Sequence, residues 1–183
     1  MIKGKAITLR PVRESDLDEL FTKSIDIESR GPWFPHPESS LGKMRKTYAE
    51  NGWWSADYGQ FAAVDDTDRL VAHVLWWKLN GSIGDTELGY RVFDPADRGK
   101  GIASEAVDLL AGWLFDSYPL NRLQLVIHVE NAASHRVAEK CGYTKETTAR
   151  GAWYHKGAWQ DVDVFTMTRA QFDQRRDDGP VAD

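Results

Sequence analysis

The chain has 183 residues and a formal net charge of −5 at pH 7, with 42% hydrophobic and 28% charged residues. This composition is ordinary for a globular protein, and the negative charge gives a nucleic-acid partner no electrostatic support. No apolar run is long enough to span a membrane, so we expect neither nucleic acid nor a membrane as a partner. The single cysteine, Cys141, excludes an internal disulfide, and the first residues lack the apolar core of a signal peptide. We therefore expect a cytoplasmic protein.

The first half of the chain predicts alternating strands and helices. Ile7 and Leu9 alternate with polar neighbours up to Pro11, which predicts an edge strand, and Ser15 is placed to cap the helix that follows. Prolines in the segment 31–37 exclude regular structure there. The later elements predicted in this half are a helix that begins near Ser39 or Ser40 and ends at Asn51-Gly52, strands Gln60–Val64 and Leu70–Leu79, and a turn over 81–85.

The second half continues the alternation. Thr86–Phe93 is predicted as a strand and Ser104–Phe115 as a helix with one apolar face, while the apolar run Leu123–Val129 predicts a central strand. The predicted elements that follow are a helix over Ala132–Lys140 ended by Gly142, a turn at Trp153–Gly157, and a last strand over Gln160–Met167. Residues 174–183 are polar and charged, which favours a disordered tail. We therefore expect one mixed α/β domain over residues 1–173.

The most informative segment lies between the strand Thr86–Phe93 and the following helix, and its sequence is Arg98-Gly99-Lys100-Gly101-Ile102-Ala103. Glycines let a backbone approach a ligand closely, and the first N–H groups of a helix point outward at the positive end of its dipole. Arg98 and Lys100 add positive charge where phosphate groups would sit. The segment therefore predicts an anion cradle.

Several ligand classes use such a cradle. A nucleotide P-loop needs Gly-Lys followed by Ser or Thr, but Lys100 is followed by Gly101. A dinucleotide-binding fold needs a third glycine or alanine three positions after the second, and that position holds Ser104. A plain glycine turn without a ligand is the remaining alternative for so short a pattern.

The surroundings of the cradle resemble a known family in order and spacing. The segments that carry the resemblance are Leu9-Arg10-Pro11, Glu87–Val92, Asp94-Pro95, Arg98–Ala103, Glu130–Ser134, Glu139–Tyr143 and Gly157–Val162. Together they resemble the GNAT acetyltransferase superfamily and, within it, the branch of the ribosomal-protein N-terminal acetyltransferases (RimJ/RimL-like). The resemblance covers roughly residues 6 to 170.

The resemblance implies a GNAT fold, in which helices flank a central mixed, mostly antiparallel β-sheet with a splayed parallel strand pair. It also implies acetyl-CoA as co-substrate. The pyrophosphate would lie on the backbone N–H groups of Arg98, Gly99, Lys100, Gly101, Ile102 and Ala103. The pantetheine arm would pair with Arg91, Val92 and Phe93 as an added strand and would contact Asn131. An asparagine is equally well placed there as a cap of the next helix.

Amine acetylation needs a base, a polarised thioester carbonyl and a proton for the leaving thiolate. Glu87, upstream of the cofactor-binding end of its strand, is the leading candidate for the base, and a substrate anchor or an arginine partner is its alternative role. His128 is the rival base, although a histidine in an apolar strand is commonly a hydrogen-bonded core residue. The position of the tyrosine that many family members use as proton donor holds Ala138. The resemblance to the ribosomal-protein branch implies Ser134, three residues after Asn131, in this role, and a hydrogen bond to the helix backbone is its alternative.

The acceptor side would comprise Glu28–Tyr58 and Arg150–Trp159, which are rich in aromatic residues. These segments suit a peptide N-terminus or a small-molecule amine. Cys141 has no histidine partner in the sequence pattern, which favours direct transfer over a covalent intermediate. No histidine spacing suggests a metal site. The function expected is an acetyl-CoA-dependent N-acetyltransferase, as monomer or homodimer. The alternatives are an acyl-CoA-binding regulatory module without transfer, suggested by Ala138, and an unrelated nucleotide-binding enzyme.

Overall fold

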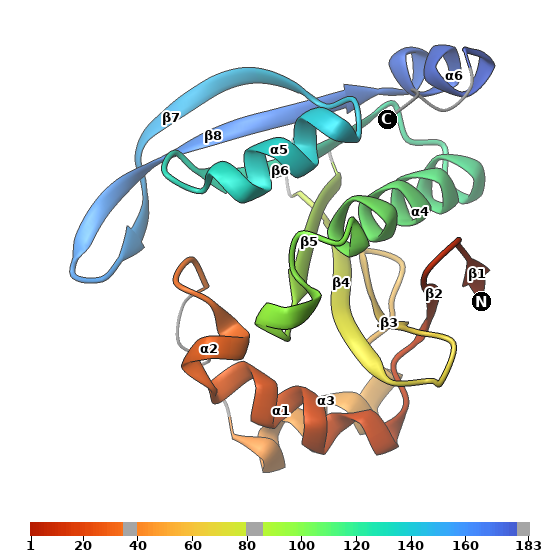
Figure 1. The fold of residues 1–183 in the computed structure, drawn as a ribbon, viewed down its shortest axis with the longest axis vertical. Coiled ribbons are helices and arrows are strands. Elements are labelled where there is room, and N and C mark those ends of the chain that lie inside the picture. The colour runs from red at the N-terminus through yellow and green to blue at the C-terminus, as the bar shows by residue number, and fades with distance from the viewer. Residues whose placement is uncertain (35–39, 80–85, 179–183) are drawn as a thin grey trace. The chain divides into compact units, whose positions relative to one another are not determined.

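A computed structural model of the chain describes residues 1–34, 40–79 and 86–178 (Figure 1). Its elements are, in chain order, β1 (Ile2–Lys3), β2 (Thr8–Pro11), η1 (Glu14–Asp16), α1 (Leu17–Ile25), α2 (Ile27–Arg30), α3 (Leu41–Asn51), β3 (Tyr58–Val64), β4 (Leu70–Lys78), β5 (Thr86–Val92), η2 (Pro95–Asp97), α4 (Ile102–Ser117), β6 (Arg122–His128), α5 (Ala132–Lys140), β7 (Thr144–His155), β8 (Ala158–Thr168) and α6 (Arg169–Asp177). The chain divides into two compact units, Met1–Trp77 with Gly89–Leu110, and Lys78–Leu88 with Ala111–Asp183. The expectation of one domain over residues 1–173 stays a prediction.

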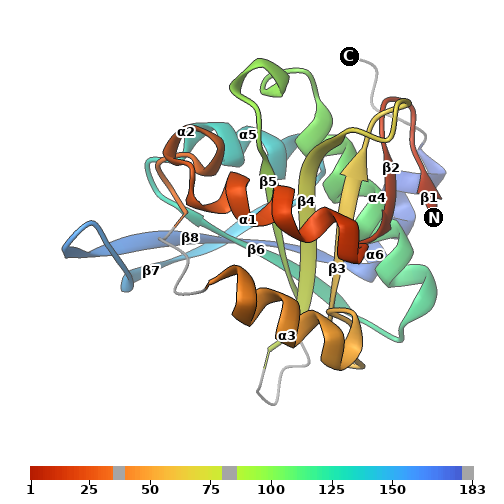
Figure 2. The same cartoon turned by 90° about the horizontal axis from the view of Figure 1, so that it is seen from below.

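In the first unit, β1, β2, β3 and β4 pair in that order, and every pair is antiparallel (Figure 2). The expected strand at Ile7–Pro11 is present as β2, but it is not an edge strand, because Ile2 and Lys3 pair with its outer side. Pro11 is tolerated because it is the last residue of the strand. The pairing with the N-terminal residues was not visible in the sequence.

Helices α1 and α3 lie side by side and help to form the core of the first unit (Figures 1 and 2). The buried residues of this core cluster are Val12, Leu17, Leu20, Trp53, Ala62, Val64, Leu70 and Phe93. Ser15 does not cap α1. It lies in the short turn η1, whose last residue, Asp16, precedes the helix and binds the side chain of Arg10. The helix start predicted near Ser39 or Ser40 is confirmed, because α3 begins at Leu41 and the side chain of Ser40 accepts a hydrogen bond from Lys43 N at 3.2 Å.

In the second unit, the start of β5 pairs with β6 in parallel, and β8 pairs antiparallel with both β6 and β7. The strand predicted at Leu123–Val129 is therefore interior, as expected. The sheet is mostly antiparallel with one parallel pair. Helix α5 has the predicted bounds, and it packs on β8 through the rings of His135 and Phe165, whose centroids are 5.3 Å apart.

The last two strands form a long hairpin, and its turn is shorter than predicted (Figure 2). The turn comprises only Lys156 and Gly157, so Trp153–His155 belong to β7. Both turn residues have positive φ, 51° and 81°, as the tight type of hairpin turn requires. A lysine rarely adopts this conformation, so the sequence did not indicate that the turn is only two residues long. Near it, residues 150–152 of β7 form a bulge opposite the single residue Asp161 of β8.

The C-terminal segment is more ordered than predicted. Residues 174–177, expected in a disordered tail, are the end of α6. The helix is anchored by Phe172, whose ring centroid lies 4.8 Å from that of Phe115, and by an ion pair of 2.9 Å between Arg176 and Asp116. A buried aromatic residue and an ion pair thus hold an otherwise polar helix. Residues 179–183 of the expected tail, the expected turn at 81–85 and residues 35–37 of the expected proline loop lie outside the described residues.

None of the helices in the described ranges combines the length and apolarity needed to cross a membrane.

Candidate functional site

The predicted cradle is present in the first unit. The turn η2 ends at Asp97, Gly99 and Gly101 have φ values of 77° and 83°, and α4 begins at Ile102. Glu105 N donates to Gly101 O at 2.9 Å at the start of the helix. The first N–H groups of a helix generally lack partners inside it and point toward the space before the helix. A Cβ added at either glycine would meet no atom within 4 Å. The glycines are therefore needed for their backbone conformation, and the space beside them is open to a ligand.

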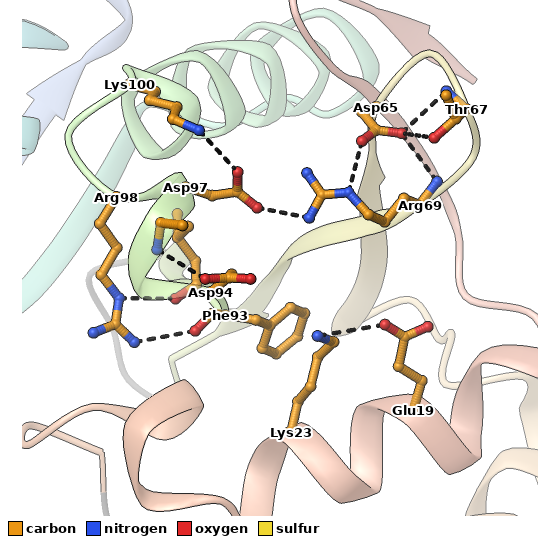
Figure 3. Close-up of polar contacts among 12 residues, drawn as sticks. Glu19, Lys23, Asp65, Thr67, Arg69, Phe93, Asp94, Asp97, Arg98 and Lys100 are labelled. Atoms are coloured by element: carbon orange, nitrogen blue, oxygen red, sulfur yellow. Dashed lines mark hydrogen bonds and ion pairs between the residues drawn. The ribbon is translucent and has the colours of Figure 1, made fainter.

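Lys100 and Asp97 form the charged part of the cradle (Figure 3). Lys100 Nζ lies 3.3 Å from Asp97 Oδ1, and Arg69 Nη1 donates to Asp97 Oδ2 at 2.8 Å. The side chain of Asp97 is only 8% exposed, and the hydrogen bond from Arg69 holds its pKa below the usual range. Arg69 also binds Asp65 at 2.9 Å. Arg69 thus gives Asp97 a counterion in addition to Lys100.

Arg98 has a different role from the one expected. Its guanidinium Nη2 donates to the carbonyl oxygens of Glu28 at 2.6 Å, Ser29 at 3.2 Å and Phe93 at 3.1 Å, and its Nε donates to Val92 O at 3.4 Å. Figure 3 shows the side chain turned toward the carbonyl of Phe93. The guanidinium of Arg98 therefore donates its hydrogen bonds to backbone carbonyls. The role of its backbone N–H group stays a prediction.

The end of β5 limits how a pantetheine arm can pair with it. Phe93 is fully buried, and its N–H donates to Val71 O on β4 at 3.1 Å, while its carbonyl accepts from Arg98. Phe93 thus has no N–H to offer an added strand. The pairing of a pantetheine arm with Arg91, Val92 and Phe93 stays a prediction. The guanidinium of Arg91 lies 5.4 Å from the ring centroid of Phe34 and 5.0 Å from that of Phe93.

Glu87 lies in the second unit, in the short stretch where β5 pairs with β6. Its Oε2 accepts a hydrogen bond of 2.9 Å from Gln124 Nε2, and the register places the two residues opposite each other. Burial raises the pKa of Glu87, and the bond from Gln124 acts in the opposite direction. Gln124 is 8% exposed and was missed in the sequence, because its importance depends on the strand register.

His128 is held on both ring nitrogens. Nδ1 accepts a hydrogen bond of 3.1 Å from Glu130 N, and Nε2 is hydrogen bonded to Gln160 Oε1. This pattern assigns the ring hydrogen to Nε2, since a nitrogen that accepts from an N–H carries no hydrogen of its own. The ring is 4% exposed and lies 6.0 Å from that of Trp153. His128 thus has the environment of a hydrogen-bonded core histidine.

Asn131 and Ser134 contact each other at the start of α5. Asn131 Oδ1 accepts from Ser134 N at 3.2 Å, and Asn131 Nδ2 donates to Ser134 Oγ at 3.0 Å. The capping role considered for Asn131 is confirmed. An amide has two N–H hydrogens and two oxygen lone pairs, so this cap does not use its full bonding capacity. Ala138 is fully buried, and its carbonyl accepts from Tyr143 N at 2.9 Å.

The predicted site residues fall into two sets. The first unit contains the cradle and the end of β5, where Arg98 contacts Val92 and Phe93. The second unit contains Glu87, Asn131 and Ser134, and the latter two are bonded to each other. Cys141 is fully buried, in keeping with a packing role.

Comparison with known proteins gives the family. An acetyltransferase (GNAT) domain matches residues 6–144. The probable N-acetyltransferase YjcK of Bacillus subtilis is 30% identical over 188 residues, which span 95% of this chain and all of that protein. The ribosomal-protein-serine acetyltransferase of Escherichia coli is 25% identical over 59% of this chain and 60% of its own length.

A solved structure, that of spermidine N-acetyltransferase from Vibrio cholerae in complex with CoA and spermine, superposes with a TM-score of 0.81. It is 21% identical, and the match covers 92% of this chain and 99% of that one. At this identity the likeness shows the fold, a mixed α/β GNAT fold with an open, mostly antiparallel sheet. The family match and the similarity to YjcK extend the conclusion to the activity: this chain belongs to the GNAT family and is a GNAT-type N-acetyltransferase.

Proposed function

We propose that the protein transfers an acetyl group from acetyl-CoA to a primary amine by direct attack in a ternary complex. The observation that carries this proposal is the cradle, where two glycines with positive φ precede α4 and leave open space beside its first turn. Such a helix start binds phosphate groups well. In a member of an acetyltransferase family, the pyrophosphate of CoA is the phosphate group expected there.

The binding roles follow from these positions. Backbone N–H groups from Arg98 to Ala103 would hold the pyrophosphate, and Lys100 would add a positive charge at the edge of the cradle. Arg91 and Val92 would pair with the pantetheine arm. Asn131 would use its remaining amide capacity for the same arm while it caps α5. The groups proposed to bind CoA are thus backbone N–H groups and side chains that already have fixed partners in the protein.

The chemistry requires three proton transfers. Glu87 would take a proton from the ammonium group of the acceptor, directly or through a water, and the neutral nitrogen would then attack the thioester carbonyl carbon. The new C–N bond forms as the C–S bond breaks, and the backbone N–H near Val92 would stabilise the oxyanion. Ser134 would give its hydroxyl proton to the CoA thiolate and regain a proton from the acylated nitrogen, directly or through a water, which leaves a neutral amide. Acetyl-CoA supplies the activated acyl group.

Glu87 is favoured over His128 as the base for two reasons. Burial raises the pKa of Glu87, which makes its carboxylate a stronger proton acceptor. The Nδ1 lone pair of His128 already accepts from Glu130 N, and its Nε2 is engaged by Gln160. A proton transferred to His128 would have to break one of these bonds.

The acceptor is proposed as a class, a primary amine on a peptide N-terminus or on a small molecule. The relatives include a ribosomal-protein-serine acetyltransferase and, among solved structures, a spermidine N-acetyltransferase. The first favours the RimJ/RimL-like branch and a peptide acceptor. Its match covers little more than half of each chain, so both kinds of amine belong in the test.

A second function, acyl-CoA binding without transfer, is favoured by one observation. Ala138 stands where many family members have a tyrosine, and its side chain is fully buried. The two functions separate in one experiment, in which thiol release from acetyl-CoA is measured against a panel of peptides, polyamines and amine antibiotics. Release with at least one amine supports transfer. Stabilisation by CoA thioesters in a thermal-shift assay without release on a broad panel supports the binding module, and failure of both contradicts the CoA assignment.

A further inference from the structure

The end of helix α2 depends on a residue that is distant in sequence. The last carbonyl groups of any helix lack partners inside it, and α2 has only four residues. Gly31 N donates to Ile27 O at 3.0 Å, and the next two carbonyls, those of Glu28 and Ser29, accept from Arg98 Nη2. Arg98 therefore caps α2 from 70 positions away.

The same guanidinium also holds the end of β5. It donates to the carbonyls of Val92 and Phe93, so one side chain joins four carbonyl oxygens from two segments. Only an arginine fork presents enough donors in fixed directions to do this, because a lysine ammonium is a single point with three rotating hydrogens.

Two further contacts join the helical segments to the end of β5. Lys23 Nζ of α1 lies 5.5 Å from the ring centroid of Phe93, and the ring of Phe34 lies over the guanidinium of Arg91 (Figure 3 shows Lys23 and Phe93). Both contacts are of the cation–π kind, and both belong to the first unit. Lys23 precedes the α2 carbonyls in sequence and Phe34 follows them. The segment from α1 to Phe34 is therefore joined to the end of β5 at three places: by Lys23, by the α2 carbonyls through Arg98, and by Phe34.

We propose that Arg98 is a positioning residue that couples occupancy of the cradle to the order of the segment 27–34. The inference rests on the proposed function and on the expectation from the sequence that residues from Glu28 onward belong to the acceptor side. Arg98 is the first residue of the cradle, and its neighbour Gly99 has the left-handed conformation. A pyrophosphate held by the cradle N–H groups restricts the backbone at Arg98, and the restricted side chain keeps its hold on the α2 carbonyls.

The coupling predicts how CoA and the amine affect each other's binding. If CoA orders the segment 27–34, the amine gains a better-formed site after CoA has bound, and by linkage the bound amine strengthens CoA binding by the same factor. Arg98 would then contribute little to the affinity for CoA itself. The ammonium of Lys100 contacts Asp97 and not the carbonyls of α2. Lys100 would therefore contribute to the affinity for CoA but not to the order of the segment 27–34.

The test is hydrogen–deuterium exchange of the full chain with and without saturating CoA, comparing wild type, Arg98→Met and Lys100→Met. We expect CoA to slow exchange in residues 27–34 by about fivefold or more in wild type and Lys100→Met, and to leave it unchanged in Arg98→Met. Equal protection in Arg98→Met, or no protection of this segment in wild type when CoA binds, would overturn the inference.

Thermal shift with CoA keeps the two proposals distinct. If CoA does not stabilise wild type at all, the proposed function fails. If it stabilises wild type and segment 27–34 does not respond, only the coupling fails. Arg98→Lys is the second variant, for use if Arg98→Met does not fold: it keeps the charge and loses the fork, so we expect it to retain CoA binding and lose the protection of segment 27–34. With an acetylated amine in hand, Arg98→Lys should raise the KM of the amine and leave that of acetyl-CoA nearly unchanged.

Discussion

Gln124 donates a 2.9 Å hydrogen bond to the carboxylate of Glu87 across the parallel pair β5–β6. The bond joins residues that stand opposite each other in the register. It favours the charged form of a carboxyl group that burial otherwise drives toward the neutral form. The reactivity of Glu87 therefore depends on the balance between its burial and this one partner.

Glu87→Gln should lower the rate of amine acetylation by about 10²-fold, since the amide keeps the shape of the side chain and cannot accept the proton. The thermal stabilisation by CoA should remain, because Glu87 is not placed in the cradle. Thiol release and thermal shift measure the two effects. Glu139→Gln, an exposed carboxylate on α5, is the control and should retain full activity. Retention of full activity by Glu87→Gln would remove Glu87 as the base.

Gln124→Met should move the acidic limb of the rate–pH profile to higher pH. The methionine has a similar volume and cannot donate, so the pKa of Glu87 rises further above its ordinary value and a higher pH is needed to form the carboxylate. Because the folded-state pKa is raised, Glu87 also makes the free energy of unfolding decrease as pH rises through that pKa. Gln160→Met, which removes the partner of His128, is the matched control. A limb that moves with Gln160→Met and not with Gln124→Met would identify His128 as the base.

Ser134→Ala and Asn131→Ala should separate catalysis from capping. Ser134→Ala keeps the bond from its backbone N–H to Asn131 and should change the free energy of unfolding by less than about 0.5 kcal/mol, while kcat falls by about 10²-fold. Asn131→Ala removes the cap of α5 and should cost about 1 kcal/mol. Urea unfolding and steady-state kinetics measure these changes. An unchanged kcat in Ser134→Ala would exclude the serine as proton donor.

Arg69→Met should destabilise the protein in a pH-dependent way. The variant leaves the buried carboxylate of Asp97 paired with Lys100 and without Arg69, which should cost about 1–2 kcal/mol at pH 7. The pKa of Asp97 is lowered in the folded state, so the stabilisation by Arg69 is present above the ordinary pKa of about 4 and disappears as pH falls through the folded-state value. Urea unfolding between pH 7 and pH 3 measures this trend.

The control for Arg69→Met is Arg176→Met, whose ion pair with Asp116 is exposed on both sides. It should change the free energy of unfolding by less than about 0.5 kcal/mol. Equal effects of the two substitutions at every pH would show that Asp97 gains nothing from Arg69.

Gly101→Ala and Gly112→Ala should have opposite effects on stability. Gly101 has a φ of 83°, so a Cβ there meets open space but strains the backbone, at a cost of about 1–2 kcal/mol. Gly112 lies inside α4, where an added Cβ would make an ordinary contact of 3.6 Å with Phe172, and alanine should stabilise by about 0.5–1 kcal/mol. Thermal unfolding of both variants measures the difference. A stable Gly101→Ala protein would show that the cradle backbone is not strained by a side chain.

The sequence was sufficient where structure depends on local conformation. Gly99 and Gly101 predicted the cradle correctly, because positive φ values and the start of a helix depend on residues that are adjacent in sequence. The same holds for the start of α3 near Ser40 and for helix Ala132–Lys140. Family resemblance then indicated CoA as the ligand to expect, which the glycine pattern alone left open.

The sequence was insufficient where a role depends on partners that are remote along the chain. Gln124 matters only because the register places it opposite Glu87, and Arg98 serves α2 only because that short helix ends beside β5. The N–H of Phe93 donates to Val71 O on β4, a bond that the sequence did not indicate. Patterns of charge and spacing do not reveal such pairings, because each pairing depends on the three-dimensional arrangement of a whole unit.

The bulge at residues 150–152 gives the β7–β8 hairpin a tolerance to changes in length. Three residues of β7 stand opposite one of β8, so the bulge holds an even number of extra residues, and Ala149 and Trp153 stay in phase on the same face. Gly151 N donates to the Asp161 carboxylate at 2.8 Å, which ties the bulge to the facing strand. Insertions or deletions of two residues here would leave the pairing of β7 with β8 in phase on both sides of the bulge. The bulge is therefore the place where β7 can change in length while its pairs with β8 are kept.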